Sequence, residues 1–403
     1  MELFWLEHKK LWRKKIVKIC VLLCFVYCVI FGSILSFQWF SFGSSDDYTS
    51  AFGNNFDGYT VIKDSQEYAL SFGGELTDET LQQIVSDYQQ MEADGMEEEL
   101  EKTDWQIVNS WLGTLYPELR DTSNYKTMIS YVDPDKLTGF YERRQQVLDE
   151  FLEVSGQVGA EKEFLHQIER KVEKPFHYEW VEGWSTLLGS MVADLGVVMA
   201  LFLGIVLSSL FAGEWHDNTS ALVLTTRNGW GKIALAKILT GLAFTVELFA
   251  LLAVSSVISQ LFFMGTAGWD MPIQNIKLIA VAPMNMLQAE IYEYAFVLLG
   301  AIGFAGIVMF ISAAVKNNVL TLLLSLAVVY GPMMIAEYLP YGMQKALDLI
   351  PLVGSSTDIF RTNTFRILGK LIWSPYLLIT IPVLIGILCM PFAIKSWSRR
   401  MKA

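Results

Sequence analysis

The sequence has no motif with which the chain could hydrolyse a nucleotide or hold a metal ion by itself. The nearest match to a phosphate-binding loop ends at Gly231-Lys232, but Thr226 stands where the first glycine belongs, and Ile233 stands where a Ser or Thr must follow the lysine. No Gly-x-Ser-x-Gly or His-Glu-x-x-His sequence occurs, and the four histidines are scattered along the chain. We therefore expect no catalytic residue, no metal site and no cofactor in this chain.

Cysteine is also scarce, and none lies in the polar part of the sequence. The four cysteines all fall in apolar segments, so no disulfide framework can stabilise the polar region. Cys20, Cys24 and Cys28 are spaced four residues apart and would share one face of a helix. Such a face could bind a metal or be acylated, but small thiols also pack well inside membrane helices, and we favour that interpretation.

Charged residues are few, and their distribution is uneven. Only 18% of the 403 residues are charged while 53% are hydrophobic, and the mean hydropathy is +0.36, which indicates an integral membrane protein. Residues 41–184 hold 30 of the 42 Asp and Glu but only 11 of the 30 Lys and Arg, a net charge of −19. The remainder carries 19 basic and 12 acidic residues, net +7. We expect the two parts to face opposite sides of a membrane, and we expect no nucleic-acid partner.

The N-terminal segment predicts a helix on the membrane surface followed by a membrane span. Residues 1–15 mix Leu, Phe and Trp with Lys, Arg and His, as in interfacial amphipathic helices that contact the lipid bilayer. Residues 16–40 form an apolar run longer than a signal-peptide core and lack a small-x-small cleavage site, so we expect an uncleaved first transmembrane helix. The basic residues before it place the N-terminus in the cytoplasm.

Five further apolar runs predict the remaining spans. These are residues 187–211, 238–263, 294–314, 319–336 and 376–394. Residues 337–375 form an external loop whose apolar pieces, 347–353 and 367–373, are too short to cross and are expected to be interfacial or re-entrant. Residues 395–403 form a cytoplasmic tail. The fold class is an α-helical integral membrane protein with six transmembrane helices and a mainly helical external domain between helices 1 and 2, with both termini cytoplasmic.

The acidic segment, residues 41–184, is the predicted external domain. Its composition before Gly74 favours turns and a small strand pair. After that point the apolar periodicity predicts four helices, over residues 77–91, 103–115, 137–154 and 160–172. About 140 residues are enough to bury a core of their own.

The polar stretch between the second and third spans, residues 212–237, predicts a cytoplasmic coupling loop. Asp217 or Asn218 could cap a short helix over residues 219–227, which Asn228-Gly229 would end. Such a helix is roughly 13 Å long, far too short to cross a bilayer. It must lie on the membrane surface or contact another protein.

This loop resembles the signature of ABC-2 type transporter permeases. In that family a Glu at the end of the second span is followed by a Gly-Thr, a Leu-Leu-x-Thr element, an Arg and a Lys that leads into the third span. The residues here that match are Glu214, Thr219, Leu222, Leu224, Thr226, Arg227 and Lys232. Asn218 departs from the pattern, because the family usually has Gly there. The large insertion between spans 1 and 2 is similar to permeases of Gram-positive bacteria.

The resemblance implies the permease subunit of an exporter in a bacterial plasma membrane. A separate ABC ATPase would bind ATP and Mg²⁺ and hold the short helix in a surface cleft, and a second permease copy, identical or not, would complete the pathway. The exported molecule would be amphipathic, peptide-like or drug-like. Leu222 and Leu224 would fill the cleft, Arg227 would pair with an acidic residue of the ATPase, and Glu214 could tie the loop to the interfacial helix through Lys9, Lys10 or Arg13.

Two acidic residues within the predicted spans leave other functions open. Glu247 is expected near the middle of the third span with no Lys or Arg on another span to pair with, and Asp194 lies in the outer third of the second span. Glu247 could line a substrate pathway or act as a polar contact between helices. A proton-coupled secondary transporter that uses Glu247 is one alternative function. A membrane sensor or receptor whose external domain binds a peptide is another.

Overall fold

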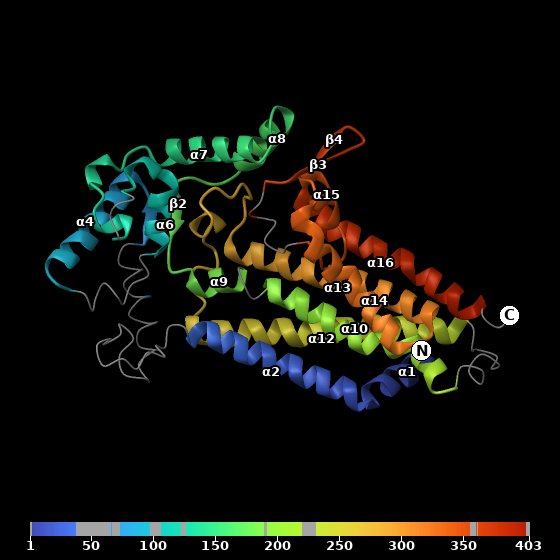
Figure 1. The fold of residues 1–403 in the computed structure, drawn as a ribbon. Helices are drawn as coiled ribbons and strands as arrows, with labels where there is room; N and C mark the ends of the chain where they lie inside the picture. The colour runs from blue at the N-terminus through green and yellow to red at the C-terminus, as the bar shows by residue number, and fades with distance from the viewer. Residues whose placement is uncertain are drawn as a thin grey trace.

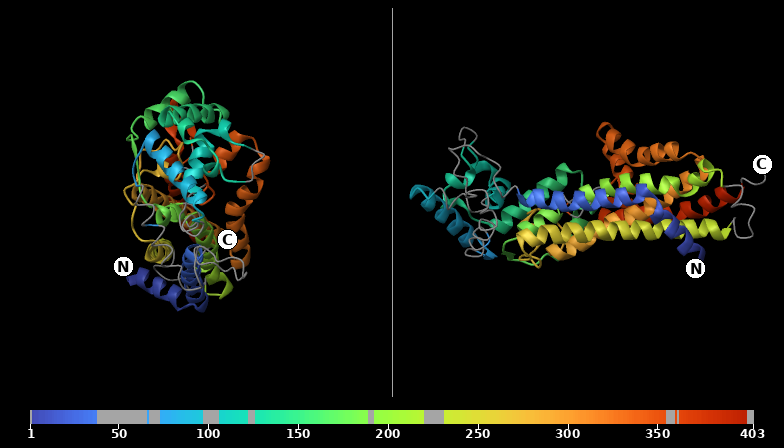
Figure 2. Two further views of the ribbon diagram at one scale, coloured as in Figure 1. Left: turned by 90° about the vertical axis from the view of Figure 1, so that its left-hand side faces the viewer. Right: turned by 90° about the horizontal axis from the view of Figure 1, so that it is seen from below.

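The computed structural model describes residues 2–37, 66, 73–96, 106–121, 126–188, 192–219, 231–354, 360 and 362–399. It is elongated, with long helices bundled side by side and a polar domain at one end (Figure 1, Figure 2). The first and last described helices, α1 (Glu2–Arg13) and α16 (Ser374–Arg399), bring both chain ends to the other end of the bundle.

Five helices in the described part are long and apolar enough to cross a membrane. They cover Leu195–His216 within α10 (Val192–His216), α12 (Gly231–Met264), α13 (Met286–Val315), Asn318–Tyr338 with α14 (Asn318–Ile335), and Ser374–Ser398 within α16. Together with the small amount of sheet, they indicate a helical integral membrane protein. The predicted first span corresponds to α2 (Lys15–Phe37), which packs along α12 but is not one of these five helices, so the count of six spans stays a prediction.

Several helices extend into polar sequence beyond the predicted spans. α10 continues to His216 and α12 begins at Gly231, so Glu214 and Lys232 lie in helices and not in the loop where we expected them. α13 begins at Met286 because Asn285 caps it: the Asn285 side chain accepts from the Gln288 backbone N–H, and the Gln288 side chain accepts from the Asn285 N–H. A tight turn joins α13 to α14, with Lys316 in the left-handed region and Asn317 capping α14.

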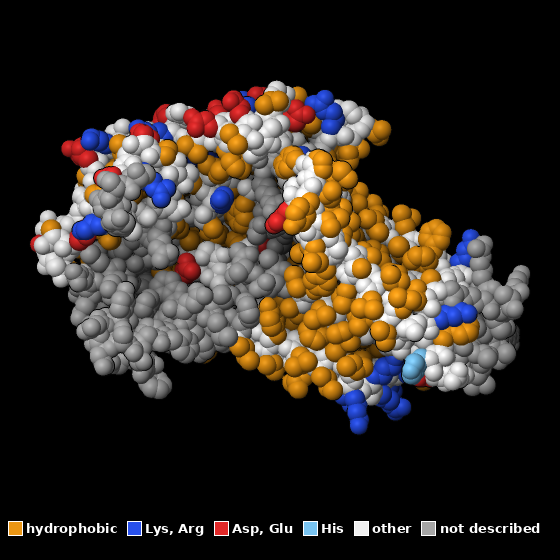
Figure 3. Space-filling view, viewed as in Figure 1, with side chains coloured by type: hydrophobic (Ala, Val, Ile, Leu, Met, Phe, Trp, Pro, Cys, Tyr) orange, Lys and Arg blue, Asp and Glu red, His pale blue; other side chains and the backbone are white. Residues whose placement is uncertain are grey.

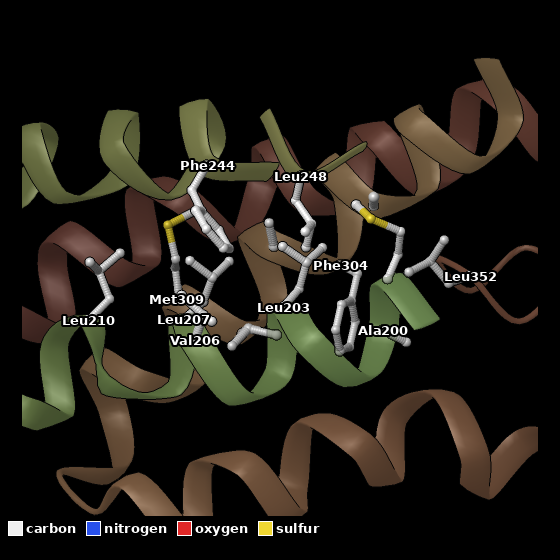
Figure 4. Close-up of a cluster of buried hydrophobic side chains, with 14 of the residues drawn as sticks. Ala200, Leu203, Val206, Leu207, Leu210, Phe244, Leu248, Phe304, Met309 and Leu352 are labelled. Carbon is white, nitrogen blue, oxygen red and sulfur yellow. The ribbon is translucent and has the colours of Figure 1, made fainter. Parts of the chain in front are cut away.

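α10, α12, α13 and α16 enclose a continuous apolar core. Leu203 and Leu207 of α10 meet Leu248 of α12 and Phe304 of α13 in this core (Figure 4). α13 and α16 pack most closely where glycines face one another, since a Cβ on Gly303 would lie 2.3 Å from a backbone oxygen of α16. Small residues at such contacts let membrane helices approach to backbone distance.

The surface of the bundle differs from that of the rest of the molecule. Hydrophobic side chains cover the bundle, whereas acidic and basic side chains are interspersed on the polar domain, and Lys and Arg gather at the end where the termini lie (Figure 3). Val254, Ile258 and Phe262 of α12 are among the exposed apolar side chains. A surface of this kind suits contact with lipid.

The polar domain consists of short helices and one small antiparallel sheet. Its elements are β1 (Gly74–Leu76), α4 (Asp78–Ala93), α6 (Gln106–Leu115), η1 (Pro117–Leu119), η2 (Met128–Ser130), η3 (Pro134–Lys136), α7 (Phe140–Val154), α8 (Ala160–Glu169), β2 (Phe176–Tyr178) and α9 (Glu182–Thr186). The helices α4, α6, α7 and α8 correspond to the four predicted helices. β1 pairs with β2 with Glu75 opposite His177. Asp78 fixes the start of α7 by accepting from the backbone N–H groups of Gly139 and Phe140.

Residues 265–285, which join α12 to α13 and include η5 (Ile273–Asn275), fold against this domain. Arg144 of α7 is fully buried there and donates to the carbonyls of Leu278 (2.7 Å) and Ala280 (3.2 Å). It also pairs with buried Glu169 at 2.6 Å. Burial opposes the charged form of Glu169, but its hydrogen bonds to Lys174 and Arg144 outweigh that effect and hold its pKa below the ordinary value. The domain is therefore attached to the segment that leads into the start of α13.

The segment between α14 and α16, where we expect interfacial or re-entrant pieces, folds into short elements. It contains η6 (Ala336–Tyr338), α15 (Tyr341–Leu347) and a hairpin of β3 (Thr364–Ile367) and β4 (Lys370–Trp373). Leu368 and Gly369 form the turn, both with positive φ. The hairpin contacts the polar domain, because Arg366 pairs with Glu161 at 2.6 Å and Thr364 donates to Gln157.

Candidate functional site

The best-defined cluster of charged side chains lies where α1 crosses the ends of α10 and α12. Glu214, on the last turn of α10, is 3% exposed. Its Oε1 accepts from Lys10 Nζ of α1 at 2.6 Å and from Lys237 Nζ of α12 at 2.8 Å, and its Oε2 accepts from the Thr219 hydroxyl. Lys237 is also buried and pairs with Glu7 of α1 at 2.8 Å. We call these five residues the charge clamp: Glu7, Lys10, Glu214, Thr219 and Lys237.

Charges within the charge clamp balance one another. Burial alone would lower the pKa of Lys10, but the hydrogen bond to Glu214 and the charges of Glu214 and Glu7 raise it above the ordinary value. Lys14 lies beside the charge clamp and donates to Ser209, and burial together with the nearby Lys237 and Lys10 lowers its pKa. Buried pairs of this kind fix one arrangement of their helices, because an unpaired charge there is costly.

The charge clamp holds both ends of the predicted coupling loop at one point. Thr219 is the last described residue before residues 220–230, and Lys237 lies on the second turn of α12. The contact that we expected between Glu214 and the interfacial helix is present, through Lys10. Glu7 was not anticipated, although its place three residues before Lys10 on one face of an amphipathic helix is a signal that sequence reasoning could have used.

Several other predicted site residues are not part of the charge clamp. Lys232 is exposed on the first turn of α12 and has no ion pair among the described residues. Asp194 belongs to the first turn of α10, and its side chain lies outside the described set. The remaining members of the predicted coupling helix, Leu222, Leu224, Thr226 and Arg227, also lie outside the described residues.

Glu247 has partners that the sequence did not reveal. Its Oε1 lies 3.1 Å from His8 Nε2, and its Oε2 accepts from the Trp12 indole N–H at 3.0 Å. Both partners belong to α1, and Trp12 also contacts Phe244 of α12 edge to face. The expectation considered partners only on other spans, whereas the amphipathic helix supplies them. If α1 lies in the interface, Glu247 is near that level and not at the middle of the bilayer.

Two buried carboxyl groups on α13 were missed entirely. Glu290 is 3% exposed and Glu293 is fully buried, and the two carboxyl oxygens of Glu293 accept no hydrogen bond in the described structure. The predicted fourth span began at residue 294, so both residues were placed in a loop. The Asn285–Gln288 capping pair was the signal that α13 starts earlier.

The end of the bundle near the charge clamp also brings aromatic rings together. Lys316, in the turn between α13 and α14, lies over the Trp215 ring at 4.2 Å from its centroid, and Trp215 contacts Trp397 of α16 edge to face. A cation over an indole ring is a favourable contact. These contacts connect the end of α10 to α16 and to the turn between α13 and α14.

No protein-family model, no curated protein and no solved structure matches this chain.

Proposed function

We propose that the chain is the permease subunit of an ABC-2 type exporter in a bacterial plasma membrane. A separate ABC ATPase hydrolyses ATP with Mg²⁺, and two permease copies, identical or related, form the pathway for an amphipathic, peptide-like or drug-like molecule. The resemblance of the loop from Glu214 to Lys232 suggests this function. The observation that carries it is the charge clamp, which joins both ends of that loop to α1.

The charge clamp is suited to transmit a conformational change of a cytoplasmic partner to the helices. An ATPase that closes on residues 219–227 displaces a segment whose ends are fixed to α10, α12 and α1 at buried ion pairs, so the three helices move together. α10 packs along α13 and α14, so its displacement reaches the helices that carry the polar domain. A loop held only by solvated side chains would instead absorb the motion.

The length of α2 and the positions of the helix ends support six spans and an external domain. α2 is 23 residues long, roughly 35 Å at 1.5 Å per residue, which is enough to cross the hydrocarbon core. With α2 counted, α1 and the C-terminal ends of α10 and α16 lie on one side (Figure 1), where Lys and Arg gather, and the acidic domain lies on the other (Figure 3). The positive-inside rule then makes the first side cytoplasmic.

The test is recovery of the ATPase with the chain purified by an affinity tag from membranes of its own cells. We expect an ATPase inhibited by orthovanadate to co-purify. The double variant Leu222→Asp with Arg227→Glu should reduce its recovery at least tenfold, because it removes the apolar anchors and reverses the cation. Lys277→Glu changes an exposed charge beside the polar domain and serves as the control. Recovery at the wild-type ratio from the double variant would show that the loop does not dock the ATPase.

A proton-coupled secondary transporter is the second candidate, and the observation that favours it is Glu293. A fully buried carboxyl group with no hydrogen bond is a better proton carrier in an apolar bundle than Glu247, which is paired with α1. Transport into inverted vesicles separates the two candidates. Loss with orthovanadate supports the exporter, whereas loss with a protonophore and not with orthovanadate supports proton coupling.

A further inference from the structure

A large cavity lies at the junction between the polar domain and the membrane bundle, away from the charge clamp. Its volume is about 680 Å³, within the usual range for small-ligand sites. One wall is the segment from Lys171 to Glu179, which contains β2, and the other runs from Asp270 to Gln288, which includes the start of α13. The cavity therefore lies between the polar domain and the segment that leads into α13.

The charged groups around the cavity are mainly acidic. Glu173, Glu179 and Asp270 line it, with Lys171 and His177 as the basic members. None of the three carboxylates forms an ion pair with any described residue, in contrast to Glu169 nearby, which Arg144 neutralises. Carboxylates that no internal cation neutralises are available to a cation from outside.

A buried acceptor in the cavity wall points to a ligand that donates hydrogen bonds. Gln274 is fully buried, and its Nε2 donates to the carbonyls of Ala280 (3.0 Å) and Ala282 (2.9 Å). Because both neighbours are acceptors, they fix which end of the amide carries the N–H groups. Its Oε1 accepts no hydrogen bond in the described structure. A buried acceptor without a donor costs roughly 1–3 kcal/mol. Water does not reach Oε1, so a ligand N–H group would offset this cost by drawing the side chain toward the cavity.

The other lining residues are the polar Asn285 and Gln288 and a set of apolar residues with three prolines and two methionines. The apolar residues are Pro175, Pro272, Pro283, Met271 and Met284, together with Val172 and Phe176. Proline presents a rigid apolar surface, and methionine adapts to side chains of different shape. The cavity thus combines an anionic side with an adaptable apolar side.

We propose that this cavity binds a cationic amphipathic peptide. A guanidinium or ammonium group of the peptide lies among Glu173, Glu179 and Asp270 and donates to Gln274, while an apolar side chain packs on the proline and methionine wall. This site does not rest on the ATP-driven export proposed above: the binding measurement below needs no ATPase, and loss of ATPase recovery would leave it unchanged.

The experiment measures binding to the purified full-length chain in lipid nanodiscs by isothermal titration calorimetry. The probe is a hexapeptide of alternating leucine and arginine with blocked ends, compared with hexapeptides in which citrulline or glutamate replaces arginine. We expect the arginine peptide to bind at least tenfold more tightly than the citrulline peptide, and the glutamate peptide not to bind. Equal affinity of the first two would overturn the proposal.

Two sets of variants locate the site. Combining Glu173→Gln, Glu179→Gln and Asp270→Asn should weaken binding of the arginine peptide at least tenfold. Asp87→Asn with Asp135→Asn and Glu150→Gln removes three exposed carboxylates of the same domain outside the cavity and should leave binding within twofold. If both sets weaken binding equally, the peptide binds the acidic surface and not the cavity.

A gain of affinity excludes misfolding as the cause. Lys171→Gln removes the lysine that lines the cavity, so we expect the arginine peptide to bind about threefold more tightly. Lys136→Gln, an exposed lysine of η3 outside the cavity, is the matched control and should change nothing. Unchanged or weaker binding to Lys171→Gln contradicts the proposal, since a misfolded variant does not bind more tightly.

Discussion

At the residue scale, the two lysines of the charge clamp differ in how much water reaches them. The Lys10 side chain is about half exposed, whereas Lys237 is buried between Glu214 and Glu7. Removing one partner of a buried pair costs roughly 3 kcal/mol, and loss of an exposed partner costs about 1 kcal/mol or less. Lys237→Met should therefore lower the midpoint of thermal unfolding in detergent clearly more than Lys10→Met does. Lys232→Met is the control, and an equal loss from both clamp variants would contradict the assignment.

Substitution of Glu293 should change the unfolding midpoint in the opposite direction. A buried carboxyl group without a hydrogen bond destabilises the bundle by roughly 1–3 kcal/mol, so Glu293→Met should raise the unfolding midpoint. Glu337→Met, at an exposed glutamate beyond α14, should leave it unchanged. If Glu293→Met lowers the midpoint, the carboxyl group stabilises the fold. A raised midpoint together with lost transport indicates that Glu293 is kept for function at a cost in stability.

At the scale of elements, Glu247 determines how firmly α1 is held on α12. His8 and Trp12 both contact its carboxylate, so Glu247→Leu should detach one face of α1. Glu247→Gln keeps an oxygen that can accept from Trp12 and should have a smaller effect. Hydrogen exchange followed by mass spectrometry should show faster exchange in residues 2–13 of the leucine variant. Val254→Ala, at an exposed α12 position, is the control, and unchanged exchange in Glu247→Leu means that other contacts hold α1.

The long helices were predictable from the sequence because long apolar runs are typical of helices that span a membrane. Their ends were not, since capping depends on hydrogen bonds between particular side chains. A prediction from hydropathy leaves residues 286–293 outside the fourth span, although the Asn285–Gln288 pair starts α13 there. The same reasoning placed Glu214 in a loop and not on α10. The complete charge clamp could not be predicted from the sequence, because only the folded chain shows that Glu7 faces Lys237.

The β3–β4 hairpin was missed for a different reason. Residues 367–373, the predicted interfacial or re-entrant piece, are mostly apolar, and this composition does not distinguish such a piece from part of a strand pair. The Leu368-Gly369 turn was a local signal for a hairpin. Its position on α8 depends on Arg366 meeting Glu161, a contact between residues far apart in the sequence, which no local pattern specifies.

At the scale of the whole molecule, the polar domain can act on the membrane bundle only if it stays attached to it. The Arg144–Glu169 pair supplies that attachment, because Arg144 also holds the carbonyls of Leu278 and Ala280 in the segment before α13. A ligand in the cavity beside this segment would thus affect the position of the start of α13. Rigid attachment is a condition for coupling between the domain and the spans.

The attachment should weaken in acid, because the pKa of Glu169 is held below its ordinary value in the folded chain by Lys174 and Arg144. A carboxyl group of this kind stabilises the fold above its unfolded pKa of about 4.3, and that stabilisation is lost as the pH falls through the lower folded pKa. We expect the unfolding midpoint to fall between about pH 5 and pH 3. In Glu169→Gln it should be lower at pH 7 and fall less over that range, because the variant has no carboxylate to protonate. Glu163→Gln, with its exposed pair to Arg170, should keep the wild-type slope, and a wild-type slope in Glu169→Gln would show that other carboxylates hold the domain on the bundle.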